Sequence, residues 1–247
     1  MKRLVLVLAL ALLARNSMAA TSTDVSYKSG DDTVHGMLYT PSGSGPFPAI
    51  VAVHEWWGLN DWVKDQANKL ADQGYVVLAV DLYRGKVAQN PDMAHQLMRG
   101  VAPDRANRDL QAAVAFLKSQ KNVKADRIGS IGWCMGGGYS LDVALLEPTL
   151  AATVINYGYL VTDPAQLKKI HASILGNFGA QDQGITPDEV HKFEQQLKSL
   201  GKSVDIKIYP DAGHAFENSN NKDGYRVADA ADAWQRTVAF FAAHLKS

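Results

Sequence analysis

Cysteine is almost absent from this chain: Cys134 is the only one among 247 residues. A single cysteine cannot form an internal disulfide, so the fold does not depend on a cross-link. An unpaired cysteine is most often a small buried hydrophobic residue. A reactive thiol is the alternative, and it needs support from the residues that surround Cys134.

The chain also lacks an excess of charge of either sign, with 25 lysines and arginines and 25 aspartates and glutamates. The first 20 residues, which we expect to be removed, contain three basic residues and no acidic one, so the mature chain would carry 22 basic and 25 acidic side chains. This balance is not typical of a protein that binds nucleic acid. We therefore expect no nucleic-acid partner.

The N-terminal apolar run is too short to cross a membrane. It extends from Leu4 to Leu13, well below the roughly 20 residues that a transmembrane helix needs. Basic residues precede it and small residues, ending at Ala19 and Ala20, follow it, which is the arrangement of a secretory signal peptide. We predict a signal peptide over residues 1–20, cleavage after Ala19 or Ala20, export to the periplasm and no membrane association afterwards.

Residues 21–247 are predicted to form one α/β domain, since a single core can organise a chain of this length. Apolar runs alternate with helical patterns, which indicates a mostly parallel sheet covered by helices on both faces. An antiparallel pair is expected ahead of this sheet, around Gly30. The strands expected after it are Ala49–Val53, Val76–Val80, Ile128–Ile131, Ala152–Ile155, Ala172–Leu175 and Val204–Tyr209. We expect a monomer.

Helical periodicity is clearest in three segments. The apolar faces expected to be buried are Val63, Ala67, Leu70 and Ala71; Leu110, Ala113, Val114 and Leu117; and, in the last helix, Val227, Ala230, Ala231, Trp234, Val238 and Phe241. The segment 84–102 has weak periodicity and is interpreted as a lid or a short helix at the edge of the sheet.

The residues around Cys134 support a reactive thiol. They read Gly132-Trp133-Cys134-Met135-Gly136-Gly137, between an apolar strand and a predicted helix. A nucleophile elbow needs such a sharp strand-to-helix turn, with small residues two positions before and two positions after the nucleophile. Cys134 is therefore the candidate nucleophile.

Two other strand ends carry the partners that a nucleophile needs. Asp182 follows the strand ending at Leu175, and His214 follows the strand ending at Tyr209. The order Cys134, Asp182, His214 is the nucleophile, acid, histidine order of α/β-hydrolases. His214 would move the thiol proton and Asp182 would orient His214. Asp188 lies nearby, but it follows a proline and is interpreted as an acid in the first turn of a helix.

The oxyanion formed during attack would need two backbone N–H donors. In this fold they come from the residue after the nucleophile and from a loop after an early strand, which indicates Met135 and Trp56. The sequence contains no complete motif for binding a metal or a nucleotide. His54-Glu55 lacks the second histidine of H-E-x-x-H, and neither a phosphate-binding loop nor G-x-G-x-x-G is present. No metal and no cofactor are expected.

At this point the chain resembles the dienelactone hydrolase family, over nearly all of the mature sequence. The resemblance rests on five motifs in family order: His54 to Leu59, Asp81 to Gly85, Gly132 to Gly137, Gly179 to Asp182, and Ala212 to Phe216. It implies a single-domain α/β-hydrolase that cleaves esters or lactones through a thioester acyl-enzyme. It also implies that Glu55 keeps the thiol protonated until a substrate binds, which would protect Cys134 from oxidation.

The resemblance has one departure that concerns the substrate, a small-molecule ester or lactone. Family enzymes that act on dienelactone hold its carboxylate with arginines, one of them shortly after the catalytic histidine, where this chain reads Glu217-Asn218-Ser219-Asn220. Loss of a bidentate arginine weakens carboxylate recognition. Arg84, Tyr83 and Trp57 are the candidate substrate-binding residues that remain.

Three alternatives stay open from the sequence. The chain is a broad-specificity carboxylesterase that does not act on dienelactone, a non-catalytic binding or scaffold relative, or a thiol-based redox protein. The intact candidate triad argues against the second. The absence of a resolving cysteine argues against the third.

Overall fold

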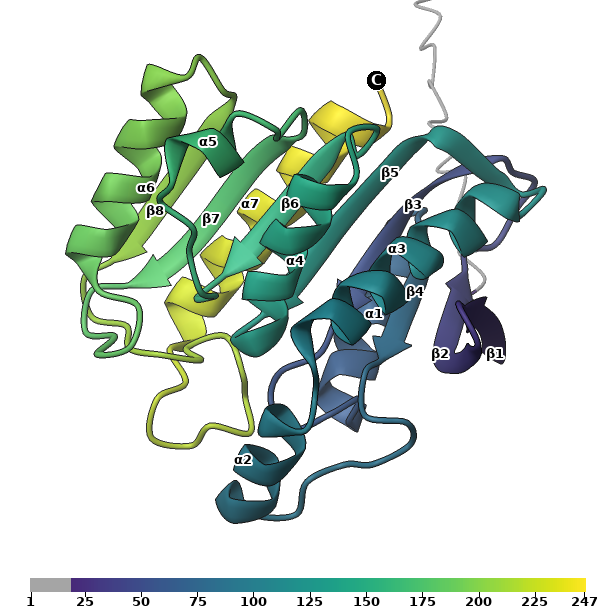
Figure 1. The fold of residues 1–247 in the computed structure, drawn as a ribbon, viewed down its shortest axis with the longest axis horizontal. Helices are drawn as coiled ribbons and strands as arrows, with labels where there is room; N and C mark the ends of the chain where they lie inside the picture. Colours follow the sequence, from purple (N-terminus) through teal and green to yellow (C-terminus); the bar gives the residue numbers. More distant parts are fainter. Residues whose placement is uncertain (1–18) are drawn as a thin grey trace, which may run out of the picture.

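An eight-stranded sheet forms the centre of the molecule, and its strands run β1-β2-β4-β3-β5-β6-β7-β8 across it (Figure 1). The computed structural model describes residues 19–247. Strands β3 to β8 are mutually parallel, and β1 and β2 are added antiparallel at one edge. The strands are β1 (Thr21–Ser29), β2 (Asp32–Thr40), β3 (Phe47–Val53), β4 (Val76–Asp81), β5 (Val123–Trp133), β6 (Ala152–Asn156), β7 (Ser173–Gly179) and β8 (Val204–Tyr209). All the predicted strands are confirmed.

Both faces of the parallel strands are buried, which is why their sequences read as continuous apolar runs. In β3, Ala49, Val51 and Val53 pack into one core cluster, whereas Ile50 and Ala52 pack into a second cluster on the other face. Alternation of side chains along each strand thus divides the core into two layers.

Helices cover each of these layers. Residues of α1 and α7 belong to one cluster, and residues of α3, α4, α5 and α6 belong to the other (Figure 1). The helices are α1 (Asp61–Asp72), α2 (Pro91–Arg99), α3 (Pro103–Ser119), α4 (Met135–Leu146), α5 (Pro164–Leu167), α6 (Pro187–Ser199) and α7 (Val227–Leu245). The fold is therefore the single α/β domain that the sequence predicts, and the stripes of α1 and α3 are buried as expected.

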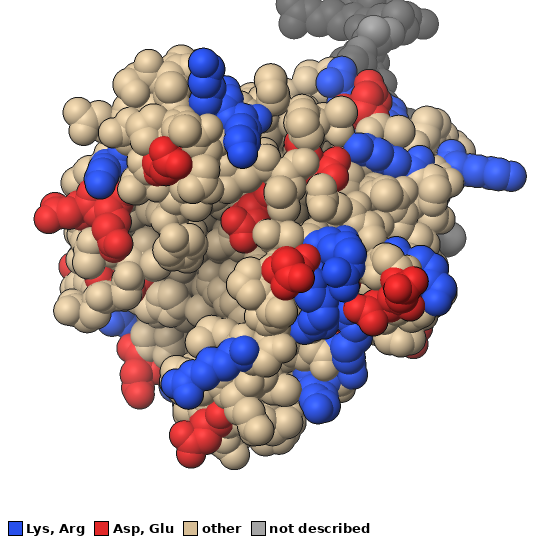
Figure 2. Space-filling model, viewed as in Figure 1, with Lys and Arg blue, Asp and Glu red and all other residues tan. Residues whose placement is uncertain are grey.

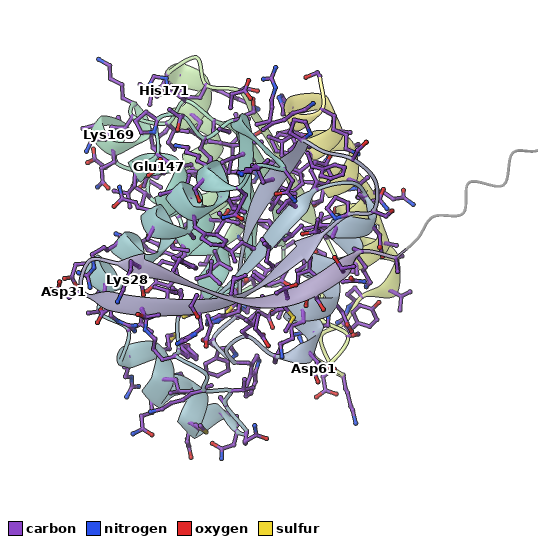
Figure 3. The ribbon with its side chains drawn as sticks, turned by 90° about the vertical axis from the view of Figure 1, so that its right-hand side faces the viewer. Lys28, Asp31, Asp61, Glu147, Lys169 and His171 are labelled. Atoms are coloured by element: carbon purple, nitrogen blue, oxygen red, sulfur yellow. The ribbon has the colours of Figure 1, made fainter. Side chains whose placement is uncertain are left out.

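The antiparallel pair β1–β2 is a hairpin with a two-residue turn. Gly30 lies in this turn with φ +59°, a conformation that glycine adopts without steric cost. Figure 3 shows Lys28 and Asp31 at the tip of the hairpin. The hairpin extends the sheet at the edge away from β7 and β8.

The predicted stripe of the last helix is only partly confirmed, because Phe241 is its one member that is fully buried. Val227 is 68% exposed, and the row that α7 buries is Ala233, Thr237, Phe241 and Leu245, spaced four residues apart. Thr237 belongs to this row although it is polar. The prediction counted only apolar residues, so it placed most of the buried face at neighbouring positions. Trp234 and Phe240 flank the row and are partly buried.

The segment 84–102 contains α2, as one of the two interpretations expected. Asn90 caps this helix by accepting a hydrogen bond from the N–H of Met93, and Pro91 occupies its first turn. Within residues 19–247, no helix has the length and apolarity of a membrane span. The predicted signal peptide lies almost wholly outside the described residues, and β1 begins at Thr21.

Candidate active site

The carboxyl ends of four parallel strands bring the predicted residues together. Glu55 follows β3, Cys134 follows β5, Asp182 follows β7 and His214 follows β8. Parallel strands end at the same edge of a sheet, so the loops after them share one side of the molecule.

Cys134 occupies a strained turn between β5 and α4. Its φ is +55° and its ψ is −120°, and α4 begins at the next residue. A Cβ on Gly132 would collide with the carbonyl oxygen of Gly136, and a Cβ on Gly136 would collide with that of Val53. These positions require glycine, as the elbow pattern predicts.

His214 and Asp182 form the hydrogen-bonded pair that the chain order predicts. The Nδ1 atom of His214 lies 2.7 Å from Oδ2 of Asp182. The other oxygen of Asp182 accepts hydrogen bonds from the backbone N–H of Gly184 (2.8 Å) and of Ile185 (3.1 Å). Because both carboxylate oxygens are held, the orientation of the imidazole is fixed by the loop after β7.

The electrostatics of this pair favour a positively charged imidazole. Burial acts to lower the pKa of His214, but hydrogen bonding to Asp182 and to Cys134 outweighs burial and raises that pKa to about 10. For Asp182, burial acts to raise the pKa, and the bonds from His214, Ile185 and Gly184 bring it below its usual value. A strongly basic imidazole of this kind favours transfer of the thiol proton to His214, which gives a thiolate beside a positively charged imidazole.

The two predicted oxyanion donors are free of backbone partners. Among residues 19–247, no hydrogen bond outside the regular helices and strands uses the N–H of Trp56 or of Met135. The carbonyl oxygen of Trp56 accepts a hydrogen bond from the hydroxyl of Tyr83 (3.0 Å), which ties the loop after β3 to the loop after β4.

Glu55, in the loop after β3, is buried, with 1% of its surface exposed. One carboxyl oxygen, Oε2, accepts a hydrogen bond from the amide of Asn218 (2.5 Å). The other, Oε1, has no hydrogen-bond partner within residues 19–247. Burial raises the pKa of Glu55 to about 7, and the Asn218 bond and the charge of His214 partly offset this effect.

A second carboxyl, Glu217, shares this region and was not predicted as a site residue. Burial raises its pKa to about 8, the indole N–H of Trp133 (3.4 Å) acts in the opposite direction, and the charge of Glu55 adds to the increase. In the described part of the chain, its Oε1 atom and the hydroxyl of Tyr157 also lack partners. The buried carboxyl of Glu55 and the partly buried carboxyl of Glu217 thus lie in a region with few donors to stabilise their charge.

Replacement of Glu217 by glutamine is expected to flatten the pH dependence of stability. The pKa of Glu217 is higher in the folded chain (about 8) than the ordinary glutamate value of 4.5, so the stability that its proton contributes is complete below about pH 4.5 and is lost as the pH rises toward 8. Glu217→Gln should remove a loss on the order of 2 kcal/mol in the free energy of unfolding between pH 5 and 8. Urea unfolding at several pH values measures it.

Glu194→Gln is the matched control for that experiment. Glu194 lies on α6 and pairs with Lys198, whose side chain is 61% exposed, so the substitution should shift stability by less than about 1 kcal/mol at every pH. If Glu217→Gln and the parent lost equal stability between pH 5 and 8, Glu217 would not be a partly buried, protonated carboxyl.

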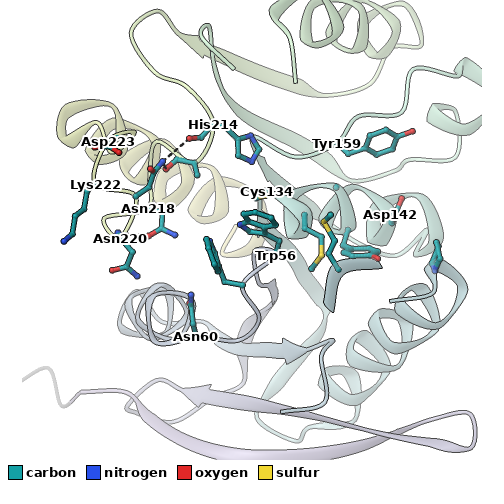
Figure 4. Close-up of a pocket in the computed structure, with 18 residues that line it drawn as sticks. Trp56, Asn60, Cys134, Asp142, Tyr159, His214, Asn218, Asn220, Lys222 and Asp223 are labelled. Atoms are coloured by element: carbon teal, nitrogen blue, oxygen red, sulfur yellow. Dashed lines mark hydrogen bonds between the residues drawn. The ribbon is translucent and has the colours of Figure 1, made fainter. Parts of the chain in front are cut away.

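A large pocket opens over Cys134 and His214. It has a volume of about 1160 Å³, and Figure 2 shows a hollow among uncharged residues on this face. The walls are mainly aromatic and apolar side chains, with polar residues of the loop after β8 on one side (Figure 4). The lining includes Trp56, Trp57, Met98, Met135, Tyr139 and Tyr159. No group of three potential metal ligands occurs within residues 19–247.

The candidate substrate-binding residues do not all lie in this pocket. Trp57 lines it, together with Trp56, whose ring centroid is 5.0 Å away. Arg84 does not line it: its guanidinium donates to the fully buried carboxylate of Asp109 at 2.7 Å. Tyr83 is 4% exposed and serves to tie two loops together. Arg84, the arginine predicted to contact a substrate carboxylate, is therefore paired with a carboxylate of the protein itself.

Sequence reasoning missed Asn218 and Asp142. Asn218 is the residue that holds Glu55, and Asp142 lines the pocket from α4. The signal for Asn218 was its place in the stretch after His214 where family enzymes that act on dienelactone carry an arginine. Asp142 had no such signal, because an acid in the middle of a helix is usually solvent-exposed.

Comparison with known proteins shows the family to which this fold and sequence are similar. The sequence pattern of the Dienelactone hydrolase family matches residues 34–245. A protein of Methylorubrum extorquens provisionally named carboxymethylenebutenolidase is 31% identical over 243 residues, covering 93% of this chain and 83% of that protein. A protein of a Bradyrhizobium species, provisionally named 2-oxo-3-(5-oxofuran-2-ylidene)propanoate lactonase, is 30% identical over 84% of this chain and 88% of its own length.

A solved structure has the same fold over nearly the whole chain. The crystal structure of a provisionally named dienelactone hydrolase from Klebsiella pneumoniae superposes with a TM-score of 0.82 and 28% identity, covering 91% of this chain and 99% of that one. The superposition covers nearly all of the described chain, so this chain has no large segment beyond the shared fold in residues 19–247.

Proposed function

This chain belongs to the dienelactone hydrolase family and is a hydrolase, and from this premise we propose that it is an exported, cysteine-dependent hydrolase of carboxylic esters or lactones. The observation that carries the proposal is the 2.7 Å hydrogen bond between Asp182 and His214, beside a cysteine held in an elbow. Aromatic walls around the same pocket suit an apolar acyl group.

In the proposed reaction, His214 takes the proton of the Cys134 thiol as the sulfur attacks the ester carbonyl carbon. The carbonyl oxygen becomes an oxyanion, which accepts hydrogen bonds from the N–H groups of Trp56 and Met135. The tetrahedral intermediate collapses, the carbon–oxygen bond breaks, and His214 protonates the leaving alkoxide. A thioester remains on Cys134.

Water then completes the cycle. His214 accepts a proton from water, the hydroxide attacks the thioester carbonyl, and the carboxylic acid leaves as the thiol is restored. For a lactone, the leaving hydroxyl stays attached to the acyl group, so the product is a single hydroxy acid. Asp182 keeps Nδ1 of His214 protonated throughout, so that Nε2 is free to exchange protons.

Glu55 is proposed to keep the thiol protonated before a substrate arrives, as the family resemblance implies. Its Oε2 atom is occupied by Asn218, and its Oε1 atom is left to accept a hydrogen bond from the thiol. Export adds a reason for such protection, because a thiolate is the form of cysteine that oxidants attack most readily. One chain supplies Cys134, Asp182 and His214, so the reaction needs no residue of a second copy, and the protein is proposed to act as a monomer.

Trapping of the acyl-enzyme tests this proposal. The exported protein is mixed with 4-nitrophenyl esters, aliphatic lactones and dienelactone, and is quenched in acid within the first turnover. Intact-mass and peptide analysis should find the acyl group on Cys134, and the intact mass also gives the signal cleavage position. Turnover without acylation of Cys134, or an acyl group on another residue, would contradict the mechanism.

A further inference from the structure

Asp142 places a carboxyl group in the wall of the pocket, away from the groups of the proposed reaction. It lies on α4, eight residues after Cys134, which corresponds to about 12 Å along the helix axis. In Figure 4, Asp142 and Tyr159 lie at one end of the pocket, the loop with Asn220 and Lys222 lies at the other end, and Cys134 lies between them.

In the part of the chain that the structure describes, no cation pairs with this carboxyl. Within residues 19–247, Asp142 lines the pocket but takes part in no ion pair and no side-chain hydrogen bond, and burial is the only cause of the rise in its pKa. The arginine of the neighbouring helix α3, Arg105, lies 3.7 Å from Asp109 and donates to the carbonyl oxygen of Leu82. Lys222 lines the pocket at its opposite end (Figure 4).

The groups around Asp142 are suited to a cation. Tyr139 of α4 and Tyr159 after β6 line the same end of the pocket, and an aromatic ring attracts a positive charge at its face. Burial raises the pKa of Asp142 to about 6, so the carboxyl is mostly ionised at pH 7.5. An anion at this end would meet a negative charge in a partly buried region, where charges are poorly screened.

The direction of the substrate follows from the reaction. The leaving alcohol must face His214, which protonates it, and the loop that follows His214 forms the end of the pocket with Asn220 and Lys222 (Figure 4). The acyl group therefore extends the other way, along α4 toward Asp142.

We propose that Asp142 selects substrates by charge, favouring esters whose acyl group ends in a positively charged amine and rejecting those whose acyl group ends in a carboxylate. This inference rests on the proposed function, because the acyl direction depends on the roles of Cys134 and His214. It makes Asp142 a specificity residue of the same pocket.

Three 4-nitrophenyl esters of equal chain length test the inference: one acyl chain ends in an amine, one in a methyl group and one in a carboxylate. The parent should prefer the amine over the carboxylate in kcat/KM, and Asp142→Asn should reduce that ratio by about tenfold at pH 7.5. The preference of the parent should also shrink at pH 5.5, where Asp142 is largely protonated. Among the described residues, the Asp142 side chain has no hydrogen-bond or ion-pair partner to lose, so Asp142→Asn should keep the thermal stability of the parent.

Asp223→Asn is the matched control. Asp223 lines the same pocket but is exposed at its other end, so its removal should change the ratio by less than about twofold. An equal change in both variants, or an Asp142→Asn ratio within twofold of the parent, overturns the inference.

Binding of the corresponding primary amides, measured by calorimetry, separates this inference from the proposed function. If the esters are not hydrolysed but the amides show an amine preference that Asp142→Asn abolishes, the proposed reaction is wrong and charge selection stands. If the esters are hydrolysed and neither kinetics nor binding depends on Asp142, charge selection is wrong and the reaction stands.

Discussion

Replacing Cys134 with alanine is expected to lower kcat/KM for a short acyl aryl ester by about 10³-fold or more, because no other group can form the acyl-enzyme. Alanine fits the elbow as well as cysteine does, since the side chain is only shortened and the glycines around it are kept. The thermal unfolding midpoint should therefore stay close to that of the parent. Spectrophotometric assay of 4-nitrophenol release measures the rate.

Cys134→Ser is the companion variant for that experiment. A hydroxyl has the geometry to attack but is a weaker nucleophile than a thiol and depends more on the base. We expect activity between that of the alanine variant and that of the parent. A Cys134→Ala variant that hydrolyses the ester as fast as the parent would remove the central claim of the proposed function.

The elbow could be predicted from sequence because its causes are local. Gly132 and Gly136 lie two residues from Cys134, and the structure confirms that a side chain at either position would strike a carbonyl oxygen. The apolar strand before the turn is equally local. The predicted strand ends also place Asp182 and His214 near Cys134, because parallel strands end at a common edge of the sheet.

Interactions between distant segments could not be predicted in this way. Asn218 binds Glu55 across 163 residues of sequence. Arg84 lies within a family motif, but its guanidinium donates to the buried carboxylate of Asp109 on α3. A motif shows which residue types occur together. It does not show whether an arginine in it contacts a carboxylate of the protein, as Arg84 contacts Asp109, or a carboxylate of a substrate.

Amphipathic patterns also have a limit that α7 illustrates. The helix buries Thr237 and leaves Val227 exposed, so hydrophobicity alone identified Phe241 but missed the rest of the buried row. Tertiary packing decides which i, i+4 row of the helix faces the sheet. Thr237 is buried because it lies in that row, although its side chain is polar.

Replacing Asp182 with asparagine is expected to lower kcat by about 10³- to 10⁴-fold with little change in stability. The carbonyl oxygen of the asparagine can keep the hydrogen bonds from Gly184 and Ile185, so its amide nitrogen is turned toward His214. That nitrogen is a donor, and Nδ1 of His214 must then accept. The proton of the imidazole moves to Nε2, where it blocks acceptance of the thiol proton.

The matched control is Asp188→Asn, which removes the other acid of this region. Asp188 is exposed in the first turn of α6, so its loss should leave kcat within about twofold of the parent and should lower stability by less than about 1 kcal/mol. The two variants carry the same chemical change six residues apart. If Asp188→Asn were the inactive one, or if Asp182→Asn kept parental kcat, the acid of the triad would be misassigned, whereas loss in Asp182→Asn alone supports the role that its hydrogen bond to His214 indicates.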